Sequence, residues 1–463
     1  MASERFEVVE ICAGAGGQSL GLHRAGFQHR LAVELDVNAA ATLRHNLARL
    51  LMEEDDTLTR EAADEAVEAV VKVGDVASPH TWAPDDYQDV DLLAGGVPCP
   101  PFSIAGKQLG ATDERDLFAW AVELCGRVRP KALLLENVKG LSGNRFSAYR
   151  QHVLERLHKH GYTGEWRLLN ASDYGVSQLR PRFVLVALQQ EYAEYFSWPD
   201  PDPDLARPVG DLLRDLMGQQ GWKGLEKWVK AANGAEGRSI APTIVGGSKK
   251  HGGADLGPTR AKVAWALLGV DAMGVANESP DKKWVRPEGV PGPKLTTAMV
   301  ARIQGWDDDR FRWEFLGRKT SVYRQIGNAF PPPVAEAVGA SIARALRKEQ
   351  KRTDVVESVS PVLDPVYALL RGSGTRALSA KQIVALLEKA EAAKTRAGTN
   401  PMTALSLPEV ERRIAHIGQD FDIVEAELKT GELTYRLGEF KAFVGQQGHA
   451  RHDLFAKNQA KIS

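Results

Sequence analysis

The chain begins with a strand, a glycine-rich loop and a helix, and this order limits the folds open to it. The apolar run Phe6–Ile11 predicts a short strand, Cys12–Gly17 contains three glycines, and leucines with helical spacing follow up to Gly26. Glycines let a ligand approach the backbone, and the start of the next helix offers free N–H groups to an anion. The pattern predicts a dinucleotide-type α/β fold; a tight strand-to-helix turn is the alternative.

The next two apolar runs also end near acidic residues. Glu34 lies at the end of Leu31–Leu35, about twenty positions after the glycines, where an acidic residue typically holds ribose hydroxyls. The acidic, alanine-rich stretch Glu53–Val70 predicts a solvated helix. Asp75 follows Val71–Val73 and is either a turn residue or part of the same site. Strands that alternate with helices and end in polar groups indicate a mostly parallel, doubly wound sheet.

A cysteine lies in a stiff loop just after another strand. The stretch Leu92–Ser103 places an apolar run before Pro98, Cys99, Pro100 and Pro101. A lone cysteine is usually a small packing residue, but a packing residue belongs on a strand or helix face rather than between prolines. A rigid loop at the carboxyl end of a strand suits a nucleophile. On these residues alone the two interpretations carry equal weight.

A carboxylate and two arginines adjoin later apolar runs. Glu136 directly follows Ala132–Leu135, and a carboxylate there is costly to bury unless it is paired or protonated. It is either a cap for the next segment or a group that hydrogen-bonds a polar ring. Arg180 and Arg182 precede another apolar strand, Phe183–Leu188.

Composition limits the class of protein. The 463 residues, 43% apolar and 26% charged, suit a globular protein of two or three domains. The net charge of −1 gives no overall attraction to nucleic acid, so any nucleic-acid site must be local. Three cysteines, of which Cys125 is expected to pack in a helix, argue against a disulfide framework. The absence of a membrane-length apolar run and of a signal-peptide core predicts a soluble intracellular protein.

The middle and the end of the chain carry weaker signals. The Pro-rich linker Trp198–Pro203 marks a domain boundary, and the glycine-rich stretch Gly246–Gly253 contains Lys249 and Lys250. Such a stretch either follows a phosphate backbone or is simply solvated. Beyond residue 350 the pattern predicts a small, mainly helical extension. Its expected helices are Val362–Leu370, Ala380–Lys394 and Leu407–Ile417.

The ordered motifs resemble those of DNA (cytosine-5) methyltransferases of the prokaryotic restriction–modification type. The resemblance covers roughly residues 5 to 350, with a variable stretch in the middle. Each motif alone is weak or moderate, but the ordered set is highly specific. The motifs are Cys12–Gly17, Glu34, Gly74–Val76, Pro98–Cys99, Glu136–Val138, Gln178–Arg182, Leu295–Thr297 with Arg302–Gly305, and Gln325–Ala335.

The resemblance implies a Rossmann-like methyltransferase fold with a divided catalytic domain. The two catalytic pieces are residues 1–190 and 295–350, and a target-recognition domain occupies residues 191–294. Residues 351–463 form the C-terminal extension, to which the resemblance assigns no role.

The resemblance also implies a covalent mechanism. Cys99 adds to carbon 6 of cytosine, and Glu136 protonates or hydrogen-bonds ring nitrogen 3. Arg182 contacts the ring carbonyl, with Arg180 as its neighbour. Methyl transfer then takes place at carbon 5. The residues implied to orient these groups are Asn137, Gln178 and Gln325.

S-adenosylmethionine is the implied methyl donor, and no metal is expected. Glu34 would hold its ribose hydroxyls, and Asp75 with Val76 would contact its adenine. Cys12 and Leu35, also assigned to the donor site, stand where the family often has aromatic residues. The other implied donor contacts are Ala13, Gly14, Gly16, Gly17, Pro98, Leu117, Asn328 and Ala329.

Double-stranded DNA is the implied substrate, with the target cytosine flipped out of the duplex. The candidate DNA contacts are Ser103, Lys249, Lys250, Arg260 and Lys262. We also expect a cognate restriction endonuclease as partner and a monomeric, cytoplasmic enzyme that joins the nucleoid when it binds DNA. A transfer-RNA cytosine-5 methyltransferase and a catalytically inactive DNA-binding regulatory scaffold are the alternatives. The long variable segment favours DNA over transfer RNA.

Overall fold

The computed structural model describes residues 5–98, 115–234, 239–246, 255–306, 309–353, 363–396 and 405–441. The chain divides into two compact units, each built from three separate stretches. The first unit contains residues 1–98, 127–138 and 166–354, and the second contains residues 99–126, 139–165 and 355–463. The expected division by role, into catalytic, target-recognition and C-terminal parts, stays a prediction.

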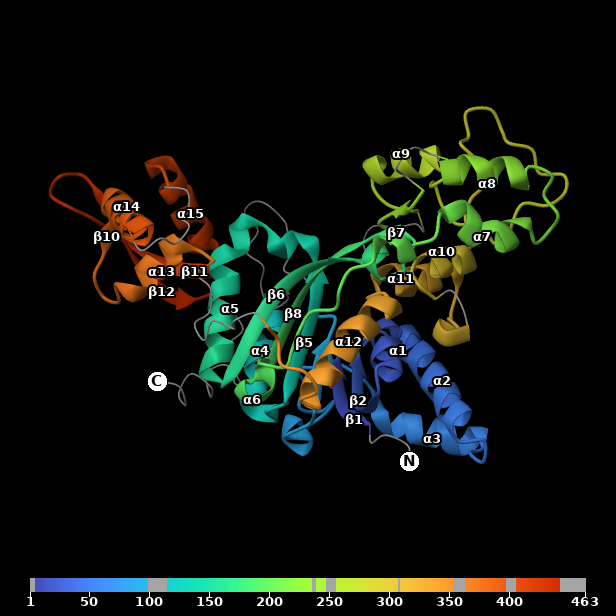
Figure 1. Ribbon diagram of the computed structural model, residues 1–463, viewed down its shortest axis with the longest axis horizontal. Coiled ribbons are helices and arrows are strands. Elements are labelled where there is room, and N and C mark those ends of the chain that lie inside the picture. The colour runs from blue at the N-terminus through green and yellow to red at the C-terminus, as the bar shows by residue number, and fades with distance from the viewer. Residues whose placement is uncertain are drawn as a thin grey trace. The chain divides into compact units, whose positions relative to one another are not determined.

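Seven strands form the main sheet: β1 (Phe6–Ile11), β2 (Phe27–Glu34), β3 (Val71–Val73), β4 (Leu92–Gly95), β5 (Ala132–Val138), β6 (Tyr162–Asn170) and β8 (Pro181–Gln189). Their order is β3-β2-β1-β4-β5-β8-β6 (Figure 1). The first five strands in this order run parallel, and β8 is antiparallel to β5. β5 and β8 are buried along nearly their whole length, as is typical of strands covered on both faces. The mostly parallel, doubly wound sheet is confirmed.

The helices of the first unit that accompany this sheet are α1 (Gly17–Arg24), α2 (Val37–Glu54), α3 (Arg60–Val70), α6 (Gln190–Ala193) and α12 (Pro332–Leu346). Proline at the first position of α12 is favourable because its missing N–H needs no partner there. Val338 of α12 lies in one buried cluster with Val8 of β1 and Leu134 of β5. A helix from late in the sequence therefore completes the core under the earliest strands.

α1 and α12 make a close contact that depends on glycine. A Cβ on Gly21 would lie 2.5 Å from the Ala335 Cβ and 2.5 Å from the Pro332 carbonyl oxygen. One turn earlier, a Cβ on Gly17 would overlap the Phe330 carbonyl. The two helices can approach this closely only because α1 has no side chain at these positions.

The prediction of one helix over Glu53–Val70 was wrong. α2 continues to Glu54, and α3 begins only at Arg60. The Asp55 carboxylate accepts hydrogen bonds from the backbone and the hydroxyl of Thr57, which closes a turn between the helices. Thr59 then caps α3 by accepting a hydrogen bond from the Ala62 N–H.

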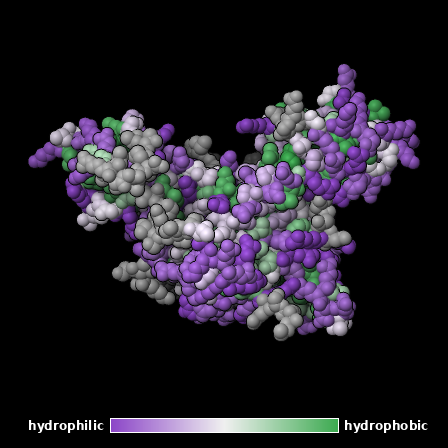
Figure 2. Space-filling model, in the orientation of Figure 1, coloured by the Kyte–Doolittle hydropathy of each residue, from purple (hydrophilic) through white to green (hydrophobic). Residues whose placement is uncertain are grey.

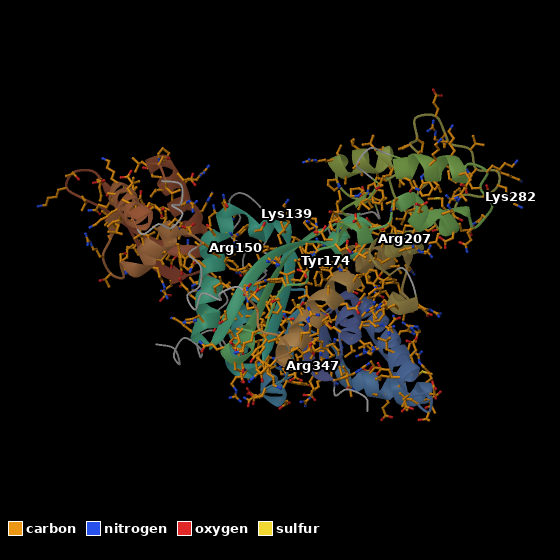
Figure 3. All side chains as sticks on the ribbon, in the orientation of Figure 1. Lys139, Arg150, Tyr174, Arg207, Lys282 and Arg347 are labelled. Carbon is orange, nitrogen blue, oxygen red and sulfur yellow. The ribbon has the colours of Figure 1, made fainter. Side chains whose placement is uncertain are left out.

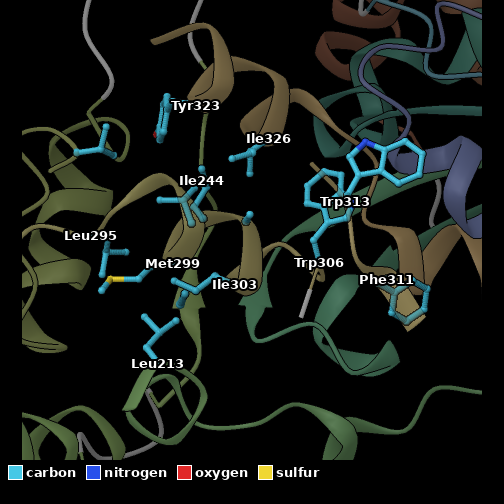
Figure 4. Packing of buried hydrophobic residues seen from close by; sticks show 14 of the residues in the cluster. Leu213, Ile244, Leu295, Met299, Ile303, Trp306, Phe311, Trp313, Tyr323 and Ile326 are labelled. Atoms are coloured by element: carbon cyan, nitrogen blue, oxygen red, sulfur yellow. The ribbon is translucent and has the colours of Figure 1, made fainter. Parts of the chain in front are cut away.

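The middle of the first unit contains α7 (Val209–Gly218), α8 (Leu225–Gly234) and α9 (Thr259–Leu267), with the short strands β7 (Gln178–Leu179) and β9 (Ala241–Pro242), and is followed by α10 (Thr297–Ile303) and α11 (Lys319–Asn328). Figure 4 shows Leu213 of α7 in one buried cluster with Met299 of α10 and Ile326 of α11. The core of this region is thus continuous with the α10–α11 pair. Arg207 and Lys282 are among its exposed basic side chains (Figure 3).

The second unit contains α4 (Arg115–Val128), α5 (Ser147–Lys159), α13 (Pro365–Gly372), β10 (Leu378–Ser379), α14 (Ala380–Arg396), α15 (Leu407–Asp420), β11 (Phe421–Glu427) and β12 (Leu433–Phe440). The three helices expected in the C-terminal extension are confirmed. The extension also has an antiparallel sheet of order β10-β12-β11. His152 of α5 packs on the rings of Phe421 and Phe440, at centroid distances of 5.3 and 4.5 Å. Cys125 is buried in α4, which confirms its packing role.

The described surface is mostly hydrophilic in the view of Figure 2. Among the described residues, no helix combines the length and the apolar composition that crossing a membrane requires.

Gly21→Ala tests the contact between α1 and α12. The added methyl group overlaps Ala335 and the Pro332 carbonyl, so we expect the free energy of unfolding to fall by about 1–3 kcal/mol, as measured by urea denaturation. Gly372→Ala is the matched control, because a Cβ at this helix end meets nothing within 4 Å, and it should be neutral or slightly stabilising. Equal stability of Gly21→Ala and the unchanged protein would contradict the contact.

Candidate active site

Three neighbouring strands are in level register at one edge of the sheet. The strand register pairs Ile11 of β1 with Gly95 of β4, and Gly95 with Leu135 of β5. The loops after β1 and β4 therefore start side by side, at the point where the strand order reverses direction, which is where open α/β sheets bind ligands. A Cβ on Gly96 would lie 3.5 Å from Glu136 Oε2 and 4.0 Å from the Cys12 carbonyl oxygen. The three chain segments share one small space.

Glu136 and Arg182 form a buried ion pair in that space. Glu136 was expected directly after a strand, but β5 continues to Val138 because β8 pairs with it up to that residue. The antiparallel register places Val138 opposite Arg182, so Arg182 is the diagonal neighbour of Glu136 on the same face. Arg182 Nε lies 2.6 Å from Glu136 Oε1, and both side chains are 9% exposed. The Nε–H does not point along this contact, so it is an ion pair rather than an aligned hydrogen bond.

Burial sets the protonation of Glu136. Removal from water raises the pKa of the Glu136 carboxyl above its ordinary value, and the nearby charges of Arg182 and Arg180 oppose that rise. The same burial lowers the pKa of both guanidinium groups. The site therefore favours a carboxyl that keeps a proton to higher pH than an exposed glutamate does.

Asn137 connects β5 to the loop that leads to Cys99. Its Nδ2 donates a hydrogen bond of 3.3 Å to the Val97 carbonyl, and its Oδ1 accepts one of 2.8 Å from the Val138 N–H. These contacts suit the orienting role expected for Asn137. Cys99 itself and Ser103 lie outside the described residues, so their roles stay predictions.

Arg180 clamps three distant pieces of backbone. It is 1% exposed, and its guanidinium donates to the carbonyls of Ile244, Gly327 and Ala329 at 2.7, 2.7 and 3.0 Å. Both terminal nitrogens are thereby engaged by the backbone. The expected role of Arg180 in catalysis stays a prediction. Its structural role is to hold these three backbone segments together.

Gln178 and Gln325 also join distant segments. Gln178 accepts a hydrogen bond from the Ile244 N–H and donates one of 2.6 Å to Gln304 Oε1. Gln304 in turn donates to the Ala329 carbonyl at 2.9 Å. Gln325 accepts from the Thr42 hydroxyl at 2.7 Å, which ties α11 to α2. These amides hold the end of α11 in place around the sheet edge.

The glycine loop is fixed to the end of β2. The Glu34 carboxylate accepts 2.7 Å hydrogen bonds from the Gly14 and Asp36 N–H groups, one on each oxygen. Burial raises the pKa of Glu34, against the effect of these N–H donors. Gly14 has φ +58°, and a Cβ there meets nothing within 4 Å, so space lies open beside the loop. The other loop residues expected at the donor site are Cys12, Ala13, Gly16 and Gly17, all buried or half-buried.

Asp75 serves as a turn residue. Its Oδ1 accepts a hydrogen bond of 2.9 Å from the Ala77 N–H, and the Val76 carbonyl accepts one of 2.6 Å from the Trp82 indole. The Val76 side chain is buried. This supports the turn interpretation, and the donor contact of both residues stays a prediction.

The remaining expected donor contacts lie in different surroundings. Leu35 is 70% exposed, and Pro98 is exposed as well. Asn328 is exposed with its Oδ1 against Gly246, and Leu117 is buried within α4 of the second unit. The structure leaves their roles as predictions.

Two of the expected DNA contacts can be placed. Arg260 is exposed at the start of α9, and Lys262 Nζ lies 2.7 Å from Asp255 Oδ2. The Lys262 charge is therefore partly neutralised by its own chain. Lys249 and Lys250 lie outside the described residues.

Comparison with known proteins identifies the family. A family model of C-5 cytosine-specific DNA methylases matches residues 6–344. The chain belongs to this family. The methylase thus transfers the methyl group of S-adenosylmethionine to carbon 5 of cytosine in DNA. Neither a transfer-RNA substrate nor an inactive scaffold gains support.

Two curated relatives cover the methylase to different extents. The Type II methyltransferase M.NaeI of Lentzea aerocolonigenes is 56% identical over 99% of this chain and 100% of its own. The Type II methyltransferase M.NgoMIV of Neisseria gonorrhoeae is 46% identical over 74% of this chain and 99% of its own. A solved structure of a putative DNA modification methyltransferase encoded within an E. coli prophage covers 74% of this chain and 99% of its own, at 21% identity and a TM-score of 0.46.

The methylase has a setting that fits S-adenosylmethionine. The open space beside Gly14 and the half-buried Glu34 carboxylate at the end of β2 give room and hydrogen-bond acceptors next to the glycine loop. The N-terminus of α1 follows directly and favours negative charge. These features suit a ligand with ribose hydroxyls and a carboxylate.

The sequence did not single out Gln18 or Gln304 as site residues. Gln304 is fully buried and links Gln178 to Ala329, a role that depends on a fold contact across more than a hundred residues. Gln18 is a polar residue in the buried first turn of α1, and that polarity was the one available signal.

Arg180→Lys tests the clamp. An ammonium group cannot span the carbonyls of Ile244, Gly327 and Ala329, so at least one charged hydrogen bond is lost and the free energy of unfolding should fall by about 2–4 kcal/mol in urea denaturation. Arg260→Lys, a change at an exposed site, should leave it unchanged. Equal effects of the two substitutions would contradict the clamp.

Proposed function

We propose that this methylase is the protective enzyme of a Type II restriction–modification system and acts through a covalent Cys99 adduct. The carrying observation is the buried Glu136–Arg182 pair, which lies beside Gly96, three residues before Cys99 in the sequence. The names of the relatives from Lentzea aerocolonigenes and Neisseria gonorrhoeae support the Type II assignment.

The chemistry explains the residue types. Carbon 5 of cytosine is a poor nucleophile, so the Cys99 thiolate first adds to carbon 6 and ring nitrogen 3 gains a proton. Glu136, with its burial-raised pKa, is the donor of that proton. Arg182 contacts the ring carbonyl and, through its charge, keeps the carboxyl in place.

The bound cofactor supplies the methyl group that carbon 5 then accepts. In this proposal Glu34 would hold the ribose hydroxyls, and the start of α1, directly after the glycine loop, would hold the carboxylate. A base removes the proton from carbon 5, the carbon–sulfur bond breaks, Cys99 leaves as the thiolate, and nitrogen 3 returns its proton to Glu136. The product is 5-methylcytosine and the enzyme is regenerated.

The target base must leave the duplex to reach this buried site, at a cost of a few kcal/mol. We assign the recognition of the flanking sequence to residues 191–294, whose surface carries Arg260 and Lys282. A monomer suffices for this mode of recognition, and a cognate endonuclease encoded separately would cut the same unmethylated sequence.

Trapping on 5-fluorocytosine tests the covalent step. Fluorine at carbon 5 blocks the final elimination, so duplex DNA with 5-fluorocytosine in many sequence contexts should form a denaturation-resistant complex with the enzyme and S-adenosylmethionine. Cys99→Ser should abolish the complex, because a serine hydroxyl ionises far less readily than a thiol with a pKa near ~8.5.

Cys125→Ala is the matched control for that substitution. Cys125 is buried in α4, so its loss should leave trapping intact. A trapped complex that survives Cys99→Ser would overturn the assignment of the nucleophile.

The pH dependence of single-turnover methylation tests Glu136. The protonated carboxyl is the active form, so the rate should fall as pH rises through the pKa of Glu136, which burial places above the ordinary value for glutamate. Glu136→Gln should be slow and should lack this alkaline fall. An identical alkaline limb in Glu136→Gln would show that another group is responsible.

A further inference from the structure

Gln18 is a buried amide that the mechanism so far does not use. It occupies the second position of α1 and is 4% exposed. Within the described part of the chain, neither its Oε1 nor its Nε2 has a hydrogen-bond partner. An unpaired buried amide is unfavourable, and an apolar side chain would fill the same space without that cost. A glutamine at this position therefore calls for a functional reason.

The Gln18 amide faces the same small space as Glu136. The position of a Cβ on Gly96 would lie 4.0 Å from Gln18 Oε1 and 3.5 Å from Glu136 Oε2. Both oxygens therefore lie around one point that carries no side chain. The Cys12 carbonyl is the third polar group around it, also at 4.0 Å.

The two oxygens of Glu136 have different neighbours. Oε1 lies 2.6 Å from Arg182 Nε, so the positive charge there disfavours a proton on Oε1. Oε2 is the oxygen nearest to the Cβ position of Gly96, the same point that Gln18 Oε1 approaches. A proton on the carboxyl is therefore placed on Oε2, where an amide oxygen can accept it.

We propose that Gln18 is a positioning residue for Glu136: its amide oxygen accepts the hydrogen of the protonated carboxyl at Oε2 before the flipped base arrives, and releases it when ring nitrogen 3 takes that place. This hydrogen bond requires the Gln18 side chain to rotate toward Oε2. The proton stays on Glu136 until it passes to nitrogen 3, so the amide gains and loses only a hydrogen bond. This rests on the proposed role of Glu136.

In the free enzyme, Gln18 should raise the pKa of Glu136. A hydrogen bond to the neutral carboxyl favours the protonated form, in the same direction as burial. The charged groups of the described chain that face the carboxyl, Arg182 and Arg180, act in the opposite direction. Gln18 thus helps Glu136 keep its proton against two arginines.

The test compares pH profiles of kcat/KM, which report ionisations of the free enzyme. Gln18→Leu removes the acceptor and should move the alkaline limb to lower pH by about half to one unit. Gln18→Glu adds a second carboxyl that shares the proton, and should move the limb to higher pH. The profile of kcat should move less than that of kcat/KM, because the base replaces Gln18 in the complex.

Thermal stability separates this role from a structural one. At a pH where Glu136 is ionised, the Gln18 amide has no hydrogen to accept, so Gln18→Leu should melt there at the same temperature as the unchanged enzyme or at a higher one. Gln151→Leu is the matched control, because Gln151 is a buried amide, 5% exposed, whose oxygen accepts from the Leu363 N–H at 2.7 Å. That variant should melt earlier and keep the pH profile of the unchanged enzyme.

Three results would overturn the proposal. The first is an unshifted alkaline limb in Gln18→Leu, and the second is a shift in the same direction for Gln18→Leu and Gln18→Glu. The third is a parallel loss of stability and activity at every pH, which marks Gln18 as structural. Failure of the underlying mechanism would be seen separately, as Cys99-independent trapping on 5-fluorocytosine by the unchanged enzyme.

Discussion

The site depends on the register of three neighbouring strands. Because Ile11, Gly95 and Leu135 are level, the residues that follow them share one space at the edge of the sheet. A shift of one residue in β5 would turn Glu136 to the opposite face, away from Arg182. The apolar residues of these strands fix the register because they must face the core. The same register determines where the Glu136 carboxyl lies.

Polar groups around this edge fall into two kinds. The first kind bonds to backbone groups or to other side chains of the same kind, and so joins segments far apart in the sequence. Its members are Arg180, Gln178 and Gln304. Gln18 lies in the same buried space as the second oxygen of Glu136, and within the described chain its amide has no such partner. Amides whose hydrogen bonds are all made give rigidity. An amide without a hydrogen-bond partner can bind different groups at different steps of the reaction.

The local sequence pattern predicted much of the fold, but few of the contacts between segments that are far apart in the sequence. The strands Phe6–Ile11 and Val71–Val73 have the predicted bounds because their apolar runs are short and sharply ended. The extension of β5 through Glu136 depends on pairing with β8, which no local pattern contains. The partners of Arg180 come from residues 244 and 327–329, so only the folded chain reveals that this arginine is a clamp.

The glycine contact between α1 and α12 has a consequence for synthesis on the ribosome. Gly21 packs against Pro332 and Ala335, more than three hundred residues later in the chain. At translation rates of about 5–20 residues per second, α1 waits roughly fifteen seconds to a minute for the helix that covers it. Throughout that time the growing chain carries the glycine loop without the element that braces it, and Glu34 and later Glu136 are added before that element is made. The methylase therefore gains its complete framework only when most of the polypeptide has been made.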